Sequence, residues 1–371
     1  MGSLLIKQLF TVFISLLVSS VYGQQTTVAV NNENILKSST ANLFDSDSVL
    51  EISLKGNMFS VLNDRSKKPK LEPIMFSYST ESGSIIEIPA EVKTRGHFRK
   101  LKENCTLPPL LLNFPTSAAL TTSLFKDQVK LKIVMPCVED DYIIKEWLVY
   151  KLYNLLTPTS FKTRLVRINI VDDKMKKKLP SFYGFLIEDE NQMAIRNQAE
   201  KIVAKFQPWQ IDSSAFKILS VFQYMIANTD WSVQYFQNIK LIVMDSTAST
   251  IAVPYDFDHA GIVNAPYAKP AEALGLYSIR ERRYRGYCIT NMKQFDESIV
   301  VFNSFKNDIY AVYSTCLLLS EKYKLATIKY LDEFYATINN TTKVKKEFGY
   351  PCNKNGTENV VIRGLKYKDD R

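Results

Sequence analysis

Three polar residues near the middle of the chain have the types and the order that phosphoryl transfer uses. Asp230, Asn238 and Asp256 fall within 27 residues. That chemistry needs one carboxylate to orient or deprotonate the attacking hydroxyl, and an asparagine with an aspartate to hold magnesium on the nucleotide phosphates. A single aspartate after a helix usually caps a turn. Three such residues, spread over a helix exit and two strands, favour a shared site instead.

The elements that must position these residues follow from the periodicity of the apolar residues. A helix is predicted over residues 213–226 and ends just before Asp230. Two short strands, QNIKLIV and TIAVPYDFD, then place Asn238 at the start of one strand and Asp256 at the end of the next. Apolar residues at helical spacing predict helices over residues 302–316 and 328–338.

The part of the chain before residue 190 reads mainly as β-structure. A helix interrupts it near residues 139–155, where apolar residues repeat at helical spacing behind three acidic residues. The order is therefore a β-rich half with one helix, followed by a helical half with a small strand pair, which indicates an α+β class. The predicted strands are SVLEISL, PIMFSYS, SIIEIPAEVKT, PPLLLNF, QVKLKIVMPC, TRLVRINIV and SFYGFLIED.

The first 23 residues have the pattern of a secretory signal peptide, with Lys7 ahead of an apolar run that is too short to span a membrane. We expect cleavage after Gly23, no transmembrane segment in the mature chain, and a periplasmic or extracellular location. Residues 24–42 are polar and predict a flexible lead-in.

Export would permit disulfides, and the chain has five cysteines, which cannot all pair with one another. Cys105, Cys137, Cys288 and Cys352 are the candidates. Cys105 and Cys137 favour a structural bridge rather than a reactive pair. Cys316 lies on a helical pattern and is predicted to be buried and free.

The composition excludes a long disordered chain, because 46% of the 371 residues are hydrophobic. The net charge of +9 indicates an anionic partner. Nucleic acid is a poor candidate for that partner, because the lysines are scattered and no aromatic-basic stripe is present.

The stretch FQYMIANTDWSVQYFQNIKLI, followed by IAVPYDFDHAG, resembles the catalytic loop and metal strand of atypical kinases. The resemblance is greatest to the spore-coat CotH kinase family, and it extends to the NTD motif of HipA-type kinases. EVKTRGHFRK with LPPLLLNF, then DDYIIKEWLVYKLYNLL, RLVRINIV and FYGFLIEDEN, resemble the preceding part of the CotH family in the order of their elements.

The resemblance implies a bilobal protein-kinase-like fold, with a β-rich N-lobe over residues 43–190, a helical C-lobe over residues 191–345 and a polar tail over residues 346–371. It also implies a role for each residue that matches. Asp230 would be the catalytic carboxylate, Asn238 and Asp256 would bind magnesium, and Asp258 would be a second ligand or a support.

The nucleotide-binding residues that the resemblance implies lie in the N-lobe. Lys132 or Lys130 would contact the nucleotide, with Lys132 preferred, and Glu146 would be supplied by the following helix. Glu188 would lie near the adenine, where the lobes join. The turn at Arg95 is the only one available to cover the phosphates, because no glycine-rich loop is present.

The spacing of the proposed catalytic loop departs from familiar kinases. Asn238 follows Asp230 by eight residues rather than about five. The extra residues must therefore loop out between Trp231 and Gln237, or the metal geometry fails and the protein is an inactive pseudokinase.

Four arginines follow the proposed metal strand, in the segment SIRERRYRGYC. They could bind an acidic substrate or a phosphate, or they could pair with acidic residues of the helical part. They are Arg280, Arg282, Arg283 and Arg285.

The sequence therefore predicts an exported kinase-like enzyme that uses ATP with Mg²⁺ or Mn²⁺ to phosphorylate a hydroxyl on a protein or a glycan, with an acidic substrate possible. The alternative is a catalytically inactive pseudokinase that serves as a binding module in the cell envelope or outside the cell.

Overall fold

The computed structural model describes residues 42–352, apart from residues 173, 175–178 and 271. The described residues belong to one compact unit. The predicted signal peptide, the lead-in before Asn42 and the tail beyond Cys352 lie outside the described residues.

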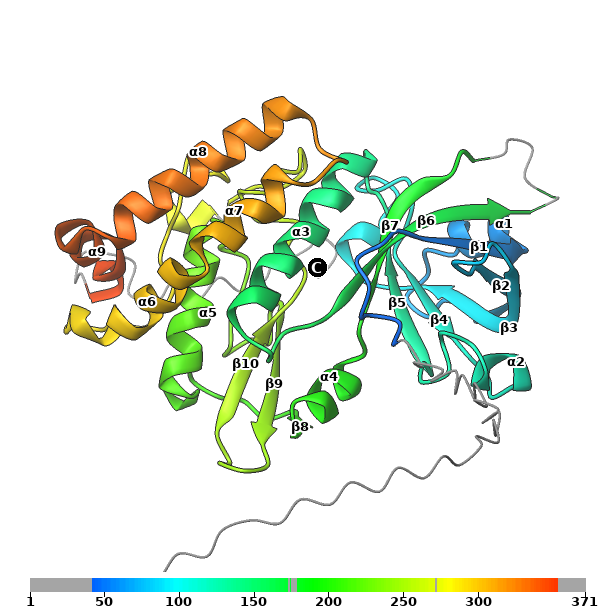
Figure 1. Ribbon diagram of the computed structural model, residues 1–371, viewed down its shortest axis with the longest axis horizontal. Coiled ribbons are helices and arrows are strands. Elements are labelled where there is room, and N and C mark those ends of the chain that lie inside the picture. Colours follow the sequence, from blue (N-terminus) through cyan, green and yellow to red (C-terminus); the bar gives the residue numbers. More distant parts are fainter. Residues whose placement is uncertain (1–41, 173, 175–178, 271, 353–371) are drawn as a thin grey trace, which may run out of the picture. The chain divides into compact units, whose positions relative to one another are not determined.

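Seven strands of the N-terminal region close into a barrel in the order β1-β2-β3-β4-β5-β7-β6 (Figure 1). Six of the seven pairings are antiparallel, and the parallel pairing of β1 with β6 closes the ring, with Leu50 opposite Val166. The strands are β1 (Leu50–Gly56), β2 (Glu72–Ser79), β3 (Ile85–Thr94), β4 (Leu110–Asn113), β5 (Lys130–Val134), β6 (Thr163–Val171) and β7 (Phe182–Ile187).

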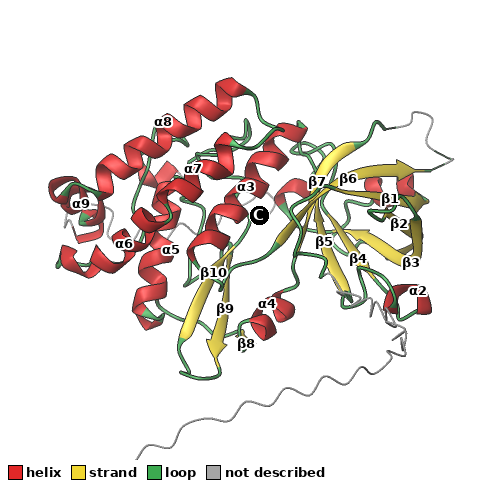
Figure 2. Cartoon of the chain, viewed as in Figure 1, coloured by secondary structure: helices red, strands yellow, loops and turns green. Residues whose placement is uncertain are grey.

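The predicted bilobal protein-kinase-like fold is wrong, because the N-terminal strands form this closed barrel rather than the β-rich lobe of a typical kinase. The alternating pattern predicted the individual strands correctly. It did not predict closure, because closure depends on a pairing between segments more than 100 residues apart in sequence. The helical character predicted for the C-terminal region is confirmed (Figure 2).

The barrel interior is filled by alternate residues of its strands, as a strand with one buried face requires. Phe76 of β2 is fully buried and meets the rings of Phe114 and Phe125 at centroid distances of 5.3 and 4.8 Å. These ring contacts, with aliphatic residues from every strand, make one continuous core.

The C-terminal region combines a three-stranded antiparallel sheet with most of the helices. The sheet order is β10-β9-β8, and the sequence did not predict β8. The strands are β8 (Ala199–Ile202), β9 (Ile239–Met244) and β10 (Thr250–Pro254). The helices of the whole described chain are α1 (Met58–Asn63), α2 (Ala118–Thr121), α3 (Asp140–Leu156), α4 (Glu190–Arg196), α5 (Ser213–Met225), α6 (Asp296–Ser304), α7 (Lys306–Ser314), α8 (Glu321–Ile338) and α9 (Thr341–Phe348).

Helix α3 joins the barrel to the helical region, because it packs on β6 and β7 on one side and on α7 on the other (Figure 1). It is buried on nearly all faces, as expected for a helix with protein on both sides. Its buried residues include Lys145 and Glu146, so charged groups lie inside the structure where α3 crosses it.

Two disulfides are present, Cys105–Cys137 and Cys288–Cys352, which confirms the predicted bridge between Cys105 and Cys137. Cys316 is free, as predicted, but it is half-buried rather than buried. None of the helices in the described part of the chain has the length and apolar character that crossing a membrane requires.

Two phenylalanine-to-alanine substitutions, one at a buried position and one at an exposed position, test the described packing of the barrel. Phe76→Ala removes a ring that is fully buried, whereas Phe59→Ala removes one that is 56% exposed. We expect Phe76→Ala to lower the free energy of unfolding by about 3–5 kcal/mol and Phe59→Ala to change it by less than about 0.5 kcal/mol. Urea denaturation followed by circular dichroism measures both, and equal losses would contradict the described packing.

Candidate functional site

Helix α5 leads to Asp230, which follows a few residues after its end. Asp212 begins the helix by accepting hydrogen bonds from the backbone of Ser214 and Ala215, which satisfies free N–H groups at the helix start. Its buried apolar face holds the far end in place. Beyond that end, the side chain of Asn228 accepts a hydrogen bond of 3.0 Å from the backbone N–H of Asp230, so the aspartate leaves the helix in a defined direction.

The residues between Asp230 and Asn238 loop out, as the long spacing required. Ser232 and Gln237 pair through two backbone hydrogen bonds of 2.9 and 3.0 Å, which close a small hairpin. Asn238 therefore returns to Asp230, and its amide nitrogen donates to the carbonyl oxygen of Asp230 at 2.8 Å and to the Oδ2 atom at 3.0 Å. The eight-residue spacing is thus compatible with contact between the two residues.

The carboxylate of Asp230 is held by amide donors on both oxygens, because the side chain of Gln237 donates to its Oδ1 atom. Burial raises the pKa of Asp230, and the charge of Asp258 raises it further, while His259 and Arg285 act against this shift. A carboxyl group that is oriented and has a raised pKa is suited to accept a proton from a hydroxyl.

Asp256 lies just beyond β10 and is held in an uncommon backbone conformation, with a φ of +63°. Its backbone N–H donates to the hydroxyl of Tyr150 at 2.9 Å. The neighbouring Phe257 is fully buried and packs on the rings of Tyr150 and Phe222. These anchors leave the side chain of Asp256 48% exposed.

A pocket of about 470 Å³ brings the predicted residues together. Arg95 and Lys132 come to it from the barrel region, while Asp230, Asn238 and Asp256 come from the segments after α5, before β9 and after β10. The pocket is thus lined by both cationic groups and carboxylates. Asp258 also lines it, whereas Glu146, Glu188 and the four arginines of the segment 280–285 do not.

Arg99 is the residue at the site that the sequence reasoning missed. It follows β3 in a short 3₁₀ turn (Phe98–Lys100) and is 7% exposed. Its Nη2 atom donates to Glu146 at 2.5 Å, and its Nε atom donates to Asp258 at 2.8 Å. The same Nη2 atom lies 4.0 Å from a carboxylate oxygen of Asp256.

Glu146 therefore pairs with Arg99 and not with Lys132, which corrects the expected lysine–glutamate pair. Arg99 is the second arginine of the stretch RGHFRK, so the sequence shows a cation at this position. The neighbouring residues do not indicate which carboxylates it contacts. Burial raises the pKa of Glu146 to about 8, although Arg99 acts to lower it. Burial alone would raise the pKa of Asp258, but Arg99 and His259 outweigh it and hold that pKa below its ordinary value.

Lys132 lies on β5 with its side chain in the pocket, and its ammonium is 6.0 Å from the ring centre of Tyr255. Lys130 is exposed and does not line the pocket, so the geometry favours Lys132 of the two candidates. Burial, together with the charge of Arg95, lowers the pKa of Lys132 to about 8.

The guanidinium of Arg95 forms no hydrogen bond or ion pair with any of the residues that the structure describes. Burial lowers its pKa and Asp256 acts to raise it, so it is a cation facing the aspartates without a bound partner. The backbone of Arg95 is fixed by a hydrogen bond of 2.9 Å to Pro109.

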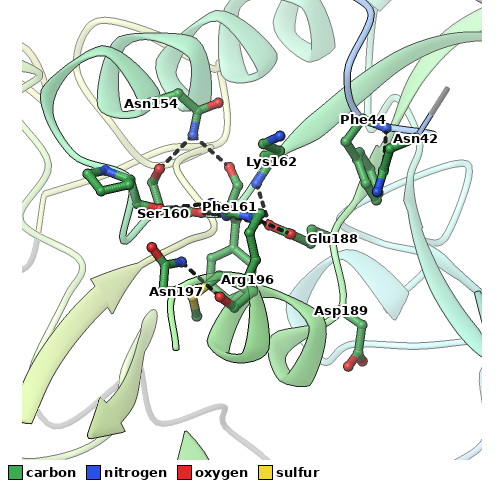
Figure 3. A network of polar contacts seen from close by, with 12 residues as sticks. Asn42, Phe44, Asn154, Ser160, Phe161, Lys162, Glu188, Asp189, Arg196 and Asn197 are labelled. Carbon is green, nitrogen blue, oxygen red and sulfur yellow. Dashed lines mark hydrogen bonds and ion pairs between the residues drawn. The ribbon is translucent and has the colours of Figure 1, made fainter. Parts of the chain in front are cut away.

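Glu188 lies outside the pocket, although its neighbour Ile187 lines it. Its carboxylate receives the side chain of Arg196 at 2.8 and 2.9 Å and the backbone N–H of Lys162 at 3.0 Å (Figure 3). Arg196 also donates to the carbonyl of Ser160 at 2.7 Å. This carboxylate therefore connects α4 to the segment before β6, and its expected place near the adenine stays a prediction.

The four arginines of the segment 280–285 divide into two pairs. Arg280 and Arg282 stack on the ring of Tyr330 at 4.3 and 3.6 Å and donate to backbone carbonyls, and Arg282 also pairs with Glu333 at 3.5 Å. Both arginines contact the helical region, and Arg282 pairs with an acidic residue there, as the alternative interpretation expected. Arg283 and Arg285 instead line a second pocket of about 250 Å³.

The protein side chains in the first pocket supply only part of the ligand set of a metal ion, so phosphate or water would have to supply the rest. Within the described ranges, no group of three or more His, Cys, Asp and Glu side chains is placed to hold a metal. Asp258 is already bound by Arg99, which leaves Asp256 and the amide oxygen of Asn238 as donors. Such a set fits Mg²⁺, which commonly takes one or two protein ligands together with phosphate oxygens and water.

No protein-family model matches the sequence, and no curated protein matches it. Among solved structures, one match is the crystal structure of a Helicobacter pylori proinflammatory kinase, CtkA. It has a TM-score of 0.38 and 12% identity, and the match covers 58% of this chain and 91% of that chain.

The chain therefore has a distant structural likeness to a kinase, and the resemblance to the CotH and HipA families remains one of sequence motifs.

Removal of Arg99 tests the buried charge cluster. Arg99→Gln leaves Glu146 and Asp258 buried without their cation, so we expect the free energy of unfolding to fall by about 3–5 kcal/mol at pH 8. The loss should be smaller at pH 5. Burial favours the protonated form of both carboxyl groups, and in the variant Arg99 no longer opposes it, so the two groups take up protons more readily as the pH falls and the cost of burying their charges declines.

Arg167→Gln is the matched control, because Arg167 stacks on Tyr183 and donates to Ser181 on the barrel. Thermal and urea unfolding at the two pH values measure both variants. A pH-independent loss, or equal losses for the two arginines, would contradict the role assigned to Arg99.

Proposed function

We propose that the protein binds ATP with Mg²⁺ or Mn²⁺ in the first pocket and transfers the γ-phosphoryl group to a hydroxyl on a protein or a glycan. The observation that carries this proposal is the convergence of Asp230, Asn238 and Asp256 in one pocket with Arg95 and Lys132. A pocket that holds both cations and metal-binding oxygens matches the charges of a metal-bound polyphosphate.

Each residue has a part in the proposed reaction. Arg95 and Lys132 would bind phosphate oxygens, and Asp256 with Asn238 would hold the metal, which neutralises charge on the phosphates when bound. Asp230 would accept the proton of the acceptor hydroxyl as its oxygen bonds to the γ-phosphorus and the bond to ADP breaks. The hydrogen bonds from Asn238 and Gln237 would keep the carboxylate oriented for that step.

Two observations support catalysis over the inactive alternative. The hairpin at Ser232 and Gln237 brings Asn238 back to Asp230 despite the unusual spacing. Asp256 remains exposed to the pocket while its neighbour Asp258 is bound by Arg99. A binding module would not need a half-exposed carboxylate beside an oriented one.

We also propose that the protein is exported to the periplasm or the extracellular space. The two disulfides support this location, because such bonds persist in oxidising compartments.

The activity is tested with three aspartate variants. We expect Mg-ATP or Mn-ATP to raise the melting temperature of the wild type, and radiolabelled ATP to show autophosphorylation or phosphorylation of a generic acceptor. Asp230→Asn should bind ATP but lose phosphotransfer by at least 100-fold, and Asp256→Asn should lose metal-dependent binding as well.

Asp245→Asn, in an exposed turn after β9, is the matched control and should behave as the wild type. The proposal fails if ATP gives no thermal shift with either metal and the three variants do not differ.

The lowered pKa of Lys132 predicts how nucleotide affinity depends on pH. With a pKa of about 8, Lys132 is mostly protonated at pH 7 and loses its charge as the pH rises to 9. Affinity for Mg-ATP should therefore decline over this range. Lys132→Met should weaken binding about 10-fold or more at pH 7 and remove most of that decline.

Isothermal titration at several pH values measures the effect, with the exposed Lys130→Met as the control. An unchanged pH profile in Lys132→Met would show that another group causes the decline.

A further inference from the structure

The hairpin that returns Asn238 to Asp230 separates two pockets. Asp230, Gln237 and Asn238 line the first pocket, whereas the residues from Trp231 to Gln234 line the second. A ligand in the second pocket would therefore be separated from the proposed catalytic carboxylate by one short loop.

The second pocket is a cationic site. Among the described residues that line it are Arg283 and Arg285, and none of them is acidic. Arg283 lies over the ring of Tyr350 at 4.2 Å. Its side chain forms no ion pair or hydrogen bond with any residue in the described part of the chain, so its charge is available to an anion.

Arg285 connects this pocket to Asp230. Its Nη1 atom donates to the carbonyl oxygens of Thr229 and Trp231, the residues on either side of Asp230, the second at 3.0 Å. Burial lowers the pKa of Arg285 to about 10, so it is still a cation at neutral pH. An anion bound beside Arg285 would act on the segment that positions the catalytic carboxylate.

The walls of the second pocket are fixed, and its rim is aromatic. The disulfide between Cys288 and Cys352 ties the short turn that carries Tyr350 to the segment that carries the arginines. Trp209 also lines the pocket and is 63% exposed, which is unusual for so large an apolar side chain. Exposed tryptophans and arginines are the residues that most often anchor a protein partner.

We propose that the second pocket binds an acidic side chain of a protein acceptor, next to the residue whose hydroxyl is phosphorylated. This inference rests on the proposed phosphotransfer. The volume of about 250 Å³ is below the usual range for small-molecule sites, and it suits one side chain that enters from a peptide outside. The planar guanidinium of arginine matches the geometry of a carboxylate.

Direct binding of peptides to the full mature chain tests this inference without depending on activity. The probe is a fluorescent peptide with one serine flanked by glutamates, and its partner has glutamine in place of each glutamate. We expect fluorescence anisotropy to show that the acidic peptide binds at least 10-fold more tightly, and that added salt weakens it.

Arg283→Gln should weaken the acidic peptide about 10-fold or more, and Trp209→Ala should also weaken it. Arg167→Gln, which changes a tyrosine-stacked arginine on the barrel, should have no effect. Mg-ATP binding should be unchanged in all three variants, because none of these residues lines the first pocket.

The outcomes separate this inference from the proposed function. If the acidic peptide binds through Arg283 but Mg-ATP does not bind, the phosphotransfer proposal fails and the pocket assignment stands. Equal affinity for the two peptides, or unchanged affinity in Arg283→Gln, overturns the inference. Binding of a sulfated oligosaccharide in place of the acidic peptide would also overturn it, because the partner would then be a glycan.

Discussion

The arrangement of the site depends on one buried cation, Arg99. Its guanidinium contacts carboxylates from two separate segments, Glu146 on α3 and Asp258 after β10, and lies near Asp256. Burying these groups without compensation would be strongly unfavourable, and one arginine with several hydrogen bonds offsets that cost. Arg99 therefore joins the barrel, the central helix and the segment after β10 that carries Asp256 and Asp258. It binds Asp258 closely and leaves the side chain of Asp256 half-exposed in the pocket.

The barrel and the helical region supply different parts of the site. The barrel contributes cations, Arg95 and Lys132, from a closed sheet whose strands cannot shift independently. The other side contributes oxygens from segments that follow α5 and β10, where backbone conformations with positive φ occur at Asn238 and Asp256. Such conformations persist only where the surrounding structure holds them, and the hydrogen bond from Asp256 to Tyr150 is one such restraint.

The sequence predicted the features that depend on local patterns. The strands of the barrel, the helix that begins at Ser213 and the trio of Asp230, Asn238 and Asp256 can all be predicted from periodicity and spacing. Barrel closure could not be read, because it depends on the pairing of Leu50 with Val166. The partner of Glu146 could not be read either, because Arg99 precedes it by 47 residues and lies in a loop. The sequence also could not predict which of the four arginines contact the helical region and which line the second pocket. Those contacts are with carbonyl groups and rings that lie far away in the sequence.

The disulfide between Cys105 and Cys137 lies beside the buried charge cluster along the chain. Cys105 follows the turn that carries Arg99, and Cys137 lies just before the helix that carries Glu146. The covalent bond thus tethers the two segments whose charges must meet inside the protein. Closing a loop of this length restricts the unfolded chain by about 3–4 kcal/mol in the chain-entropy model. Assembly of the charge cluster is therefore linked to the oxidation state of the compartment in which the chain folds, and a reducing environment would weaken the same contacts that orient the acidic groups.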